Sequence, residues 1–238
     1  MKPKGKLYLI PVTMGECEPM DVLAQTVPRA IELIQNYIVE NEKTARKFIK
    51  SVVPNKVQAD LILSTLNKHT EIVEHNKMIQ PCLDGINVGL MSEAGCPGVA
   101  DPGAVIVKLA HEKGIQVVPL VGPSSILMAM MASGMNGQSF AFNGYLPIDK
   151  SDKKVALKNF EKVSHDKNQS QLFIETPYRN NKLVEDLLQT LQPNTHLCIA
   201  TDISLPTEFI KTMRVTEWKK NLVDIHNRPT IFIIHKFS

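Results

Sequence analysis

Gly85-Ile86-Asn87-Val88-Gly89-Leu90-Met91-Ser92-Glu93-Ala94-Gly95-Cys96-Pro97-Gly98-Val99-Ala100-Asp101-Pro102-Gly103 is the stretch that decides the fold class. Residues 85–91 have the apolar character of a buried strand, and residues 103–114 that of a helix ended by glycine. The loop between them is rich in glycine and proline, so its backbone can approach a ligand closely while staying rigid. Ligands of open α/β sheets bind outside the carboxyl ends of strands, so we predict a binding loop. An elaborate strand-to-helix connection is the alternative.

Strands and helices alternate on both sides of this loop. The pattern predicts an α/β protein of two lobes, each a mixed, mostly parallel sheet flanked by helices. We place the lobes at residues 1–121 and 122–238. Strands are expected at residues 7–10, 37–39, 85–91, 115–120, 139–145, 171–174, 197–200 and 230–234, and helices at 27–34, 44–53, 71–82, 103–114, 124–132, 150–162 and 180–191, with 61–66 ambiguous.

Two further segments place polar groups where a strand ends. In Pro119-Leu120-Val121-Gly122-Pro123-Ser124-Ser125 a serine can cap the following helix, or offer its hydroxyl and backbone N–H to a ligand. In Phe173-Ile174-Glu175-Thr176-Pro177-Tyr178-Arg179 an apolar strand runs into a carboxylate, an aromatic ring and a guanidinium. A plain ion pair at a helix start is the alternative for this segment.

Composition excludes several classes. The 27 Lys and Arg against 24 Asp and Glu do not indicate a general nucleic-acid binder, so any RNA-binding surface has to be local. The four scattered cysteines have no metal or redox spacing and indicate reduced thiols in a cytoplasmic protein. No apolar run approaches the roughly 20 residues of a membrane span, and no dinucleotide or phosphate-loop motif occurs. The lysine run at residues 150–154 is typical of a solvated helix face.

Five segments in order resemble the tetrapyrrole methylase superfamily, and most closely its branch of ribosomal-RNA small-subunit 2′-O-methyltransferases. They are residues 5–11, 92–103, 118–125, 142–147 and 173–179. The resemblance implies a two-lobed α/β fold with S-adenosylmethionine in the cleft between the lobes, and a homodimer. It also implies methyl transfer to a hydroxyl, most closely a ribose 2′-hydroxyl of ribosomal RNA. Methyl transfer is an in-line displacement that needs alignment in a dry site and no metal.

Position by position, the resemblance and the three segments give a set of candidate residues. The candidates for cofactor binding are Pro11, Met14, Ser92, Gly95, Cys96, Val99, Gly122, Ser125, Ile126 and Ala200. Glu175 and Arg179 are candidates for positioning the acceptor, and Glu40 or Glu175 for taking its proton. The candidates for substrate binding are Lys43 and Arg46, which could grip phosphate, and Tyr178.

Departures from the branch pattern fall on the acceptor side. Asn41-Glu42-Lys43 stands where the branch has Asp-Thr-Arg, and Tyr178 where it has histidine. Two alternatives therefore stay open. One is a methyltransferase of the same fold that acts on a small molecule, such as a tetrapyrrole-like acid, or on a protein. The other is a non-catalytic paralogue that binds the cofactor or RNA.

Overall fold

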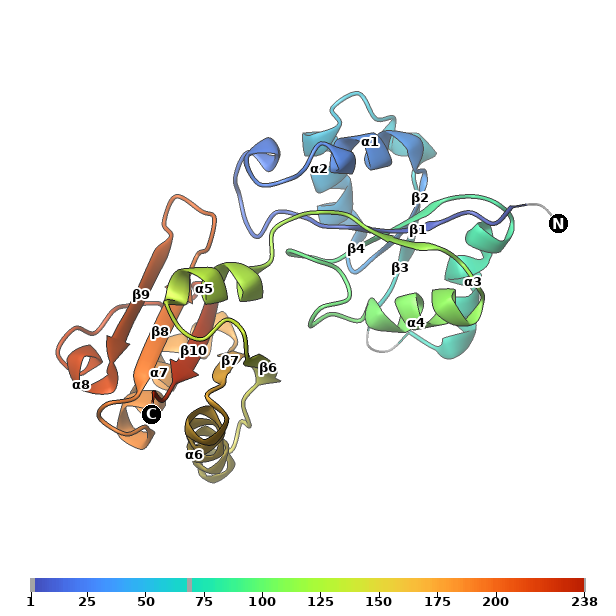
Figure 1. Ribbon diagram of the computed structural model, residues 1–238. Coiled ribbons are helices and arrows are strands. Elements are labelled where there is room, and N and C mark those ends of the chain that lie inside the picture. Colours follow the sequence, from blue (N-terminus) through green and yellow to red (C-terminus); the bar gives the residue numbers. More distant parts are fainter. Residues whose placement is uncertain (1–2, 68–69, 238) are drawn as a thin grey trace. The chain divides into compact units, whose positions relative to one another are not determined.

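The computed structural model describes residues 3–67 and 70–237 (Figure 1). The chain divides into two compact units, Met1–Ser124 and Ser125–Ser238. No helix of the described part is long and apolar enough to cross a bilayer.

A parallel sheet forms the centre of the first unit. Its strands are β1 (Leu7–Ile10), β2 (Asn36–Val39), β3 (Ile62–Thr65), β4 (Val88–Met91) and β5 (Val117–Pro119), in the order β3-β2-β4-β1-β5. Every neighbouring pair is parallel, with Met91 opposite both Ile10 and Val39. All five carboxyl ends therefore lie along one edge of the sheet, and the ambiguous segment at 61–66 contains a strand.

Helices cover both faces of this sheet (Figure 1). They are α1 (Thr26–Leu33), α2 (Glu42–Val52), α3 (Ile72–Leu83) and α4 (Ala104–Glu112), with 3-10 turns η1 (Pro19–Asp21) and η2 (Gln58–Asp60). Because side chains alternate along a strand, each strand feeds two cores. Tyr8 and Ile10 pack with α1 and α2, and Leu7 and Leu9 with α3 and α4.

Gly89 occupies the middle of the central strand β4. A Cβ atom at this position would lie 2.8 Å from Ile10 Cδ1 and 2.8 Å from Tyr37 Cδ1. Both neighbours are fully buried, and the Tyr37 hydroxyl donates to the carbonyls of Ile31 and Ile34. The absence of a side chain at Gly89 is what lets the two flanking strands pack closely.

The second unit contains a mixed sheet of different character. Its strands are β6 (Phe140–Tyr145), β7 (Ser170–Ile174), β8 (His196–Thr201), β9 (Phe209–Arg214) and β10 (Thr230–His235), in the order β6-β7-β10-β8-β9. Only β6 and β7 pair in parallel, and the other three pairs are antiparallel. The expectation of a mostly parallel second sheet is therefore wrong. A short loop joins β8 to β9, which forces an antiparallel pair, and β10 enters between β7 and β8 in the opposite direction.

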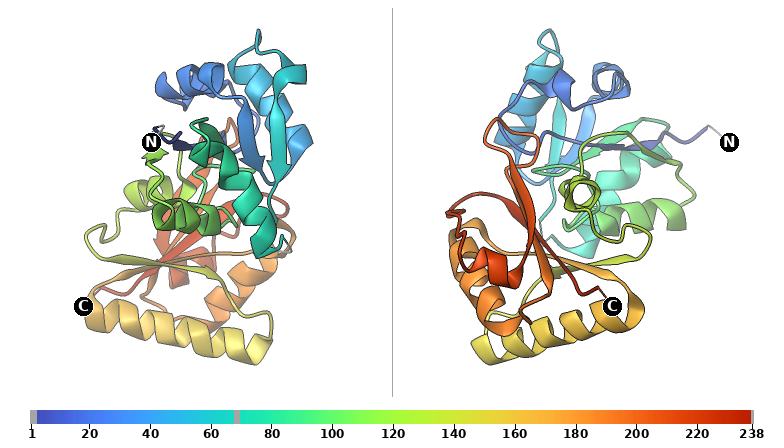
Figure 2. Two further views of the ribbon diagram at one scale, coloured as in Figure 1. Left: turned by 90° about the vertical axis from the view of Figure 1, so that its right-hand side faces the viewer. Right: turned by 60° about the vertical axis from the view of Figure 1, so that its left-hand side comes forward.

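Helices flank this sheet as well. They are α5 (Ser125–Ser133), α6 (Lys150–Lys167), α7 (Asn180–Thr190) and α8 (Val215–Trp218), with a 3-10 turn η3 (Pro177–Arg179). The long yellow helix in Figure 2 is α6, at the margin of the unit. It runs beyond the expected end at residue 162 and stops at Asn168, whose φ of 47° is left-handed.

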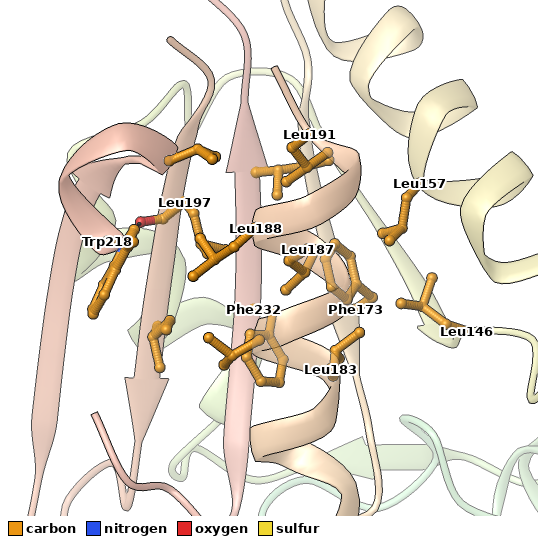
Figure 3. Packing of buried hydrophobic residues seen from close by; sticks show 14 of the residues in the cluster. Leu146, Leu157, Phe173, Leu183, Leu187, Leu188, Leu191, Leu197, Trp218 and Phe232 are labelled. Carbon is orange, nitrogen blue, oxygen red and sulfur yellow. Dashed lines mark hydrogen bonds between the residues drawn. The ribbon is translucent and has the colours of Figure 1, made fainter. Parts of the chain in front are cut away.

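The core of the second unit lies between α7 and the sheet (Figure 3). Phe173 of β7 and Phe232 of β10 stack with their ring centroids 5.9 Å apart, and the leucines of α7 pack over them. The fully buried Trp218 joins this core and donates from its indole N–H to the Leu197 carbonyl at 2.8 Å. These contacts fix the strands whose ends carry the candidate residues of this unit.

Candidate active site

Three loops leave the carboxyl edge of the first sheet, after β1, β4 and β5, and they are fastened to one another. Val12 N–H donates to the Gly95 carbonyl at 2.9 Å, and Gly95 N–H donates back at 3.2 Å. The Cys96 thiol lies 3.3 Å from the Pro123 carbonyl oxygen. The structure thus brings together most of the predicted cofactor residues of this unit, namely Pro11, Ser92, Gly95, Cys96 and Gly122.

Small residues make this convergence possible. A Cβ atom on Gly122 would overlap with Cβ and Cγ of the Pro11 ring. Gly95 and Gly98 have φ of 69° and 84°, in the left-handed region that favours glycine. The Ser92 hydroxyl turns back onto the Gly95 carbonyl at 3.4 Å. The loops therefore present mainly backbone groups and small neutral side chains at the sheet edge.

Asp101 shapes the loop after β4 from within. Both of its carboxylate oxygens lie 2.9 Å from the Gly98 nitrogen, and Oδ1 accepts from Gly103 N–H at 2.6 Å. Burial raises the pKa of Asp101, while the hydrogen bonds from Gly103 and Gly98 oppose that shift. This carboxylate is turned onto its own loop, so its structural role is to close the loop.

Glu40 follows β2 directly and lies at the same edge. Its Oε1 accepts from Glu93 N–H at 3.1 Å. Burial raises the pKa of Glu40, the bond from Glu93 N–H lowers it, and the charges of Asp101 and Glu93 raise it further. The net rise makes Glu40 a better proton acceptor, when ionised, than an ordinary glutamate.

A hollow of about 440 Å³ lies between the loop after β1, one side of α2 and the loop after β4. Two predicted residues, Met14 and Ser92, line it. Sequence reasoning missed Lys47, whose ammonium pairs with Glu16 at 3.0 Å on the exposed rim. Lys47 lies one helical turn after Lys43, a spacing that could have identified it.

The two predicted phosphate-binding residues have different surroundings. Arg46 donates to the carbonyls of Gln58 at 2.6 Å and Leu61 at 3.4 Å, so its guanidinium fastens α2 to the segment before β3. Lys43 is exposed in the first turn of α2, which the Asn41 side chain caps by accepting from Lys43 N–H at 2.9 Å. Lys43 is therefore better placed than Arg46 to meet a ligand.

In the second unit, β7 and β8 end along one edge of the sheet. Ile231 of β10 lies opposite both Ile174, the last residue of β7, and Ala200, the second-last residue of β8. Glu175, which follows Ile174, therefore lies at the same edge of the sheet as the end of β8. Ala200 itself is fully buried within β8. Ser125 and Ile126 form the first turn of α5 in this unit. A common ligand for Ala200, Ser125 and Ile126 stays a prediction. The same holds for the half-exposed Val99 of the first unit and the loops around it.

Glu175 and Arg179 form an ion pair at the start of α7. Glu175 Oε1 accepts from the Arg179 guanidinium at 2.7 Å and from Thr176 N–H at 2.7 Å. The hydrogen bond to Glu175 raises the pKa of Arg179, and the guanidinium lies 5.4 Å from the centroid of the exposed Tyr178 ring. Glu175 is buried and serves as an anchor for Arg179, which favours positioning over proton transfer for this carboxylate.

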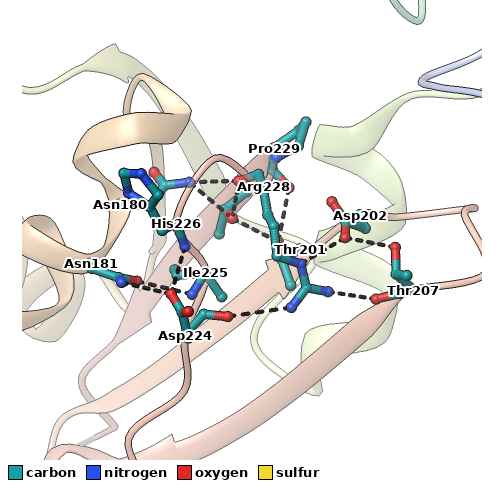
Figure 4. A network of polar contacts seen from close by, with 11 residues as sticks. Asn180, Asn181, Thr201, Asp202, Thr207, Asp224, Ile225, His226, Arg228 and Pro229 are labelled. Carbon is teal, nitrogen blue, oxygen red and sulfur yellow. Dashed lines mark hydrogen bonds and ion pairs between the residues drawn. The ribbon is translucent and has the colours of Figure 1, made fainter.

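A polar network fixes the neighbouring loops of the second unit (Figure 4). Arg228 donates to Asp202 Oδ2 at 2.7 Å and to the Thr207 carbonyl at 2.6 Å. Asn180, at the start of α7, donates to the Arg228 carbonyl at 2.6 Å. Sequence reasoning did not single out this network, because its members are spread over about 50 residues of the chain.

The model of the tetrapyrrole (corrin/porphyrin) methylase family matches residues 6–218 of the chain. The chain belongs to this family. One relative is the ribosomal RNA small subunit methyltransferase I of Vibrio cholerae, 26% identical over 97% of this chain and 77% of its own length. Its namesake from Bacillus subtilis is 30% identical over 79% of this chain and 60% of its own length.

Solved structures share the fold of this tetrapyrrole methylase. The methyltransferase CobJ has a TM-score of 0.65 at 16% identity and covers 98% of this chain and 94% of its own. A uroporphyrin-III C-methyltransferase from Thermus thermophilus, complexed with S-adenosylhomocysteine, has a TM-score of 0.57 at 17% identity, with 98% of both chains covered. The predicted family, the α/β fold class and the methyltransferase class are thereby confirmed. The roles of the individual residues stay predictions.

Proposed function

We propose that this tetrapyrrole methylase transfers a methyl group from S-adenosylmethionine to a ribose 2′-hydroxyl of small-subunit ribosomal RNA. The observation that carries the proposal is the set of fastened loops after β1, β4 and β5, at the edge where α/β sheets bind ligands. The curated relatives named as small-subunit ribosomal RNA methyltransferases support the acceptor class.

The residues at this edge fit a sulfonium cofactor. When bound, S-adenosylmethionine supplies an electrophilic methyl group on a sulfur whose positive charge disappears during transfer. A carboxylate aimed at that sulfur would stabilise the ground state more than the transition state. Gly95, Cys96 and Gly122 offer small neutral surfaces, and the Asp101 carboxylate is occupied by Gly98 and Gly103. The chemistry of the loops therefore suits the cofactor.

Glu40 is the proposed proton acceptor. Bound S-adenosylmethionine would supply the methyl group and be released as S-adenosylhomocysteine, and the Glu40 carboxylate would accept the proton that the acceptor hydroxyl loses. The raised pKa of Glu40 favours this transfer. Arg179 and Tyr178, both exposed in part, are proposed to position the acceptor, and Lys43 to contact phosphate.

The test combines calorimetry with S-adenosylhomocysteine and transfer of tritiated methyl to small-subunit ribosomal RNA that lacks its methyl groups. Glu40→Gln should lower kcat by about 10²- to 10⁴-fold while keeping cofactor affinity. Glu42→Gln, two residues further on and exposed, is the matched control and should behave as wild type.

The outcomes separate the parts of the proposal. Cofactor binding with no label in RNA would refute the RNA acceptor. Label in a metabolite extract instead would identify a small-molecule methyltransferase. A protein that binds neither S-adenosylmethionine nor its demethylated product would refute the methyltransferase mechanism altogether.

A further inference from the structure

Helix α6 carries a row of lysines on one face. Lys150, Lys154, Lys158 and Lys162 follow one another at intervals of four residues, so the row extends over about 18 Å. All four are exposed, and none forms an ion pair with any residue among 3–67 and 70–237. We refer to these four residues as the α6 lysine row.

Two hollows accompany the α6 lysine row between α6 and the end of α7. A hollow of about 150 Å³ is lined by the first two lysines of the row, and one of about 580 Å³ by the last two. Thr190 of α7 lines both, so the hollows adjoin each other. The row therefore borders a groove rather than a convex surface, and Figure 2 shows α6 with its full length along the margin of the unit.

Three carboxylates also line this groove. Glu161 accepts a hydrogen bond at 2.8 Å from the backbone of the loop after α7. Asp186 pairs with Lys153 at 3.4 Å, and Asp166 lies 3.2 Å from His165. The hydrogen bond leaves the negative charge of Glu161 in place, but the six lysines that line the two hollows outnumber these three carboxylates, so the groove is electropositive.

Lys236, which follows β10, adds a fixed charge to the larger hollow. Its ammonium donates to Gln192 Oε1 and to Asn194 Oδ1. Both acceptors are neutral, so they hold the ammonium in place without neutralising it. An anion that enters this hollow meets a positioned positive charge as well as the exposed lysines of the row.

We propose that the α6 lysine row and Lys236 bind the phosphate backbone of the RNA substrate, as a contact additional to the residues assigned to methyl transfer. The inference rests on the proposed function, in which the acceptor is RNA. Neighbouring lysines of the row are about 6 Å apart along the helix, which suits a line of successive negative charges. Lysines act as point charges on phosphate and carry no base specificity, so this contact positions the RNA without reading its sequence.

The test uses the full chain and small-subunit ribosomal RNA without methyl groups. The variant Lys154→Gln/Lys158→Gln/Lys162→Gln removes three charges from the groove. Lys211→Gln/Lys219→Gln/Lys220→Gln removes three exposed charges from the same unit outside the groove. Binding is measured from 50 to 300 mM salt, with S-adenosylhomocysteine calorimetry as a check on folding.

The groove variant should reduce the slope of log Kobs against log salt by about 2 to 3, the value for three lost phosphate contacts. KM for RNA should rise about 3- to 100-fold, with kcat and cofactor affinity unchanged. The control variant should keep the wild-type slope.

Two results would overturn the inference while leaving the RNA acceptor in place. One is a wild-type slope in the groove variant, and the other is an equal loss in both variants, which would indicate a general charge effect. If the wild-type protein binds the cofactor but shows no salt-dependent RNA binding, the RNA acceptor of the proposed function fails too.

Discussion

Replacing Gly89 by alanine tests the packing at the centre of the first unit. The added Cβ would lie 2.8 Å from Ile10 Cδ1 and Tyr37 Cδ1, whereas carbon atoms in contact need about 3.5 to 4.0 Å. The neighbours would have to retreat by about 0.7 to 1.2 Å. Tyr37 resists because its ring is buried and its hydroxyl is held by two backbone carbonyls. Overpacking of this kind costs about 1–3 kcal/mol.

Hydrogen exchange of the β1 and β4 amides measures this cost, because it reports on the first unit alone. Gly89→Ala should lower their protection by about 5- to 150-fold, which corresponds to 1–3 kcal/mol. The protein has a single tryptophan, Trp218, in the second unit, so fluorescence-detected unfolding serves as an internal control. Gly137→Ala, in the second unit, is the comparison variant, since nothing lies within 4 Å of its Cβ. It should leave β1 and β4 exchange unchanged, and tryptophan-detected unfolding should show a neutral effect or a stabilisation of up to about 1 kcal/mol.

A second substitution tests the cause of the effect. Ile10→Val removes the Cδ1 atom that the new methyl group would meet, at a cost of about 0.5–1.5 kcal/mol by itself. The destabilisation of the double variant should be smaller than the sum of the two single-variant values, by at least about 0.5 kcal/mol. Full protection in Gly89→Ala, or strict additivity in the double variant, would refute the packing argument.

Three further substitutions test the site. Burial raises the pKa of Glu40, so ionisation of this carboxylate in the folded protein lowers the free energy of unfolding. The stability contributed by the protonated Glu40 is fully present below the ordinary pKa of 4.5 and is lost as pH rises through the folded-state pKa. Glu40→Gln should therefore be more stable than wild type at pH 8 and not at pH 4, as measured by urea unfolding. Glu175→Gln should destabilise the second unit by about 1–3 kcal/mol in tryptophan-detected unfolding, because Arg179 loses its charged partner. Gly122→Ala should weaken S-adenosylhomocysteine binding about 5- to 150-fold in calorimetry by displacing the Pro11 ring, and unchanged affinity would contradict the fastened-loop geometry.

The first unit could be predicted from the sequence nearly completely, because its strands are short apolar runs separated by helices. Parallel pairing then follows from the crossover connections. Residues 61–66 stayed ambiguous because Ile62 and Leu63 are followed by Ser64 and Thr65, and β3 lies at the edge of the sheet. Its polar end is tolerated there, where one side of the strand has no partner strand.

The second unit was predicted less well. From the sequence, no strand is expected at β9, Phe209-Ile210-Lys211-Thr212-Met213-Arg214. In the structure this strand has two half-buried residues followed by one exposed residue, twice over. This pattern has neither the period of a buried strand nor that of a helix. The place of β10 between β7 and β8 also lies beyond local sequence, because pairing between distant strands depends on tertiary packing.

The candidate site could also be predicted only in part from the sequence. Glycine and proline identified the loops, because these residues report backbone conformation directly. The roles of single side chains depend on contacts across the fold, which spacing alone does not reveal. Arg46 donates hydrogen bonds to two carbonyls, and Lys47 lines the hollow. The Glu175 carboxylate forms an ion pair with Arg179.

The position of β10 sets the order in which the second unit can form during synthesis. Residues 230–235 come after all the other strands in sequence, yet they fill the gap between β7 and β8. Until they leave the ribosome, those two strands expose unpaired backbone edges that invite association with other chains. The last strand of the first sheet ends at Pro119, so pairing of the five strands of the first unit does not wait for the end of the chain. A nascent chain should therefore carry one finished unit and one open sheet, a stage at which chaperones have most to protect.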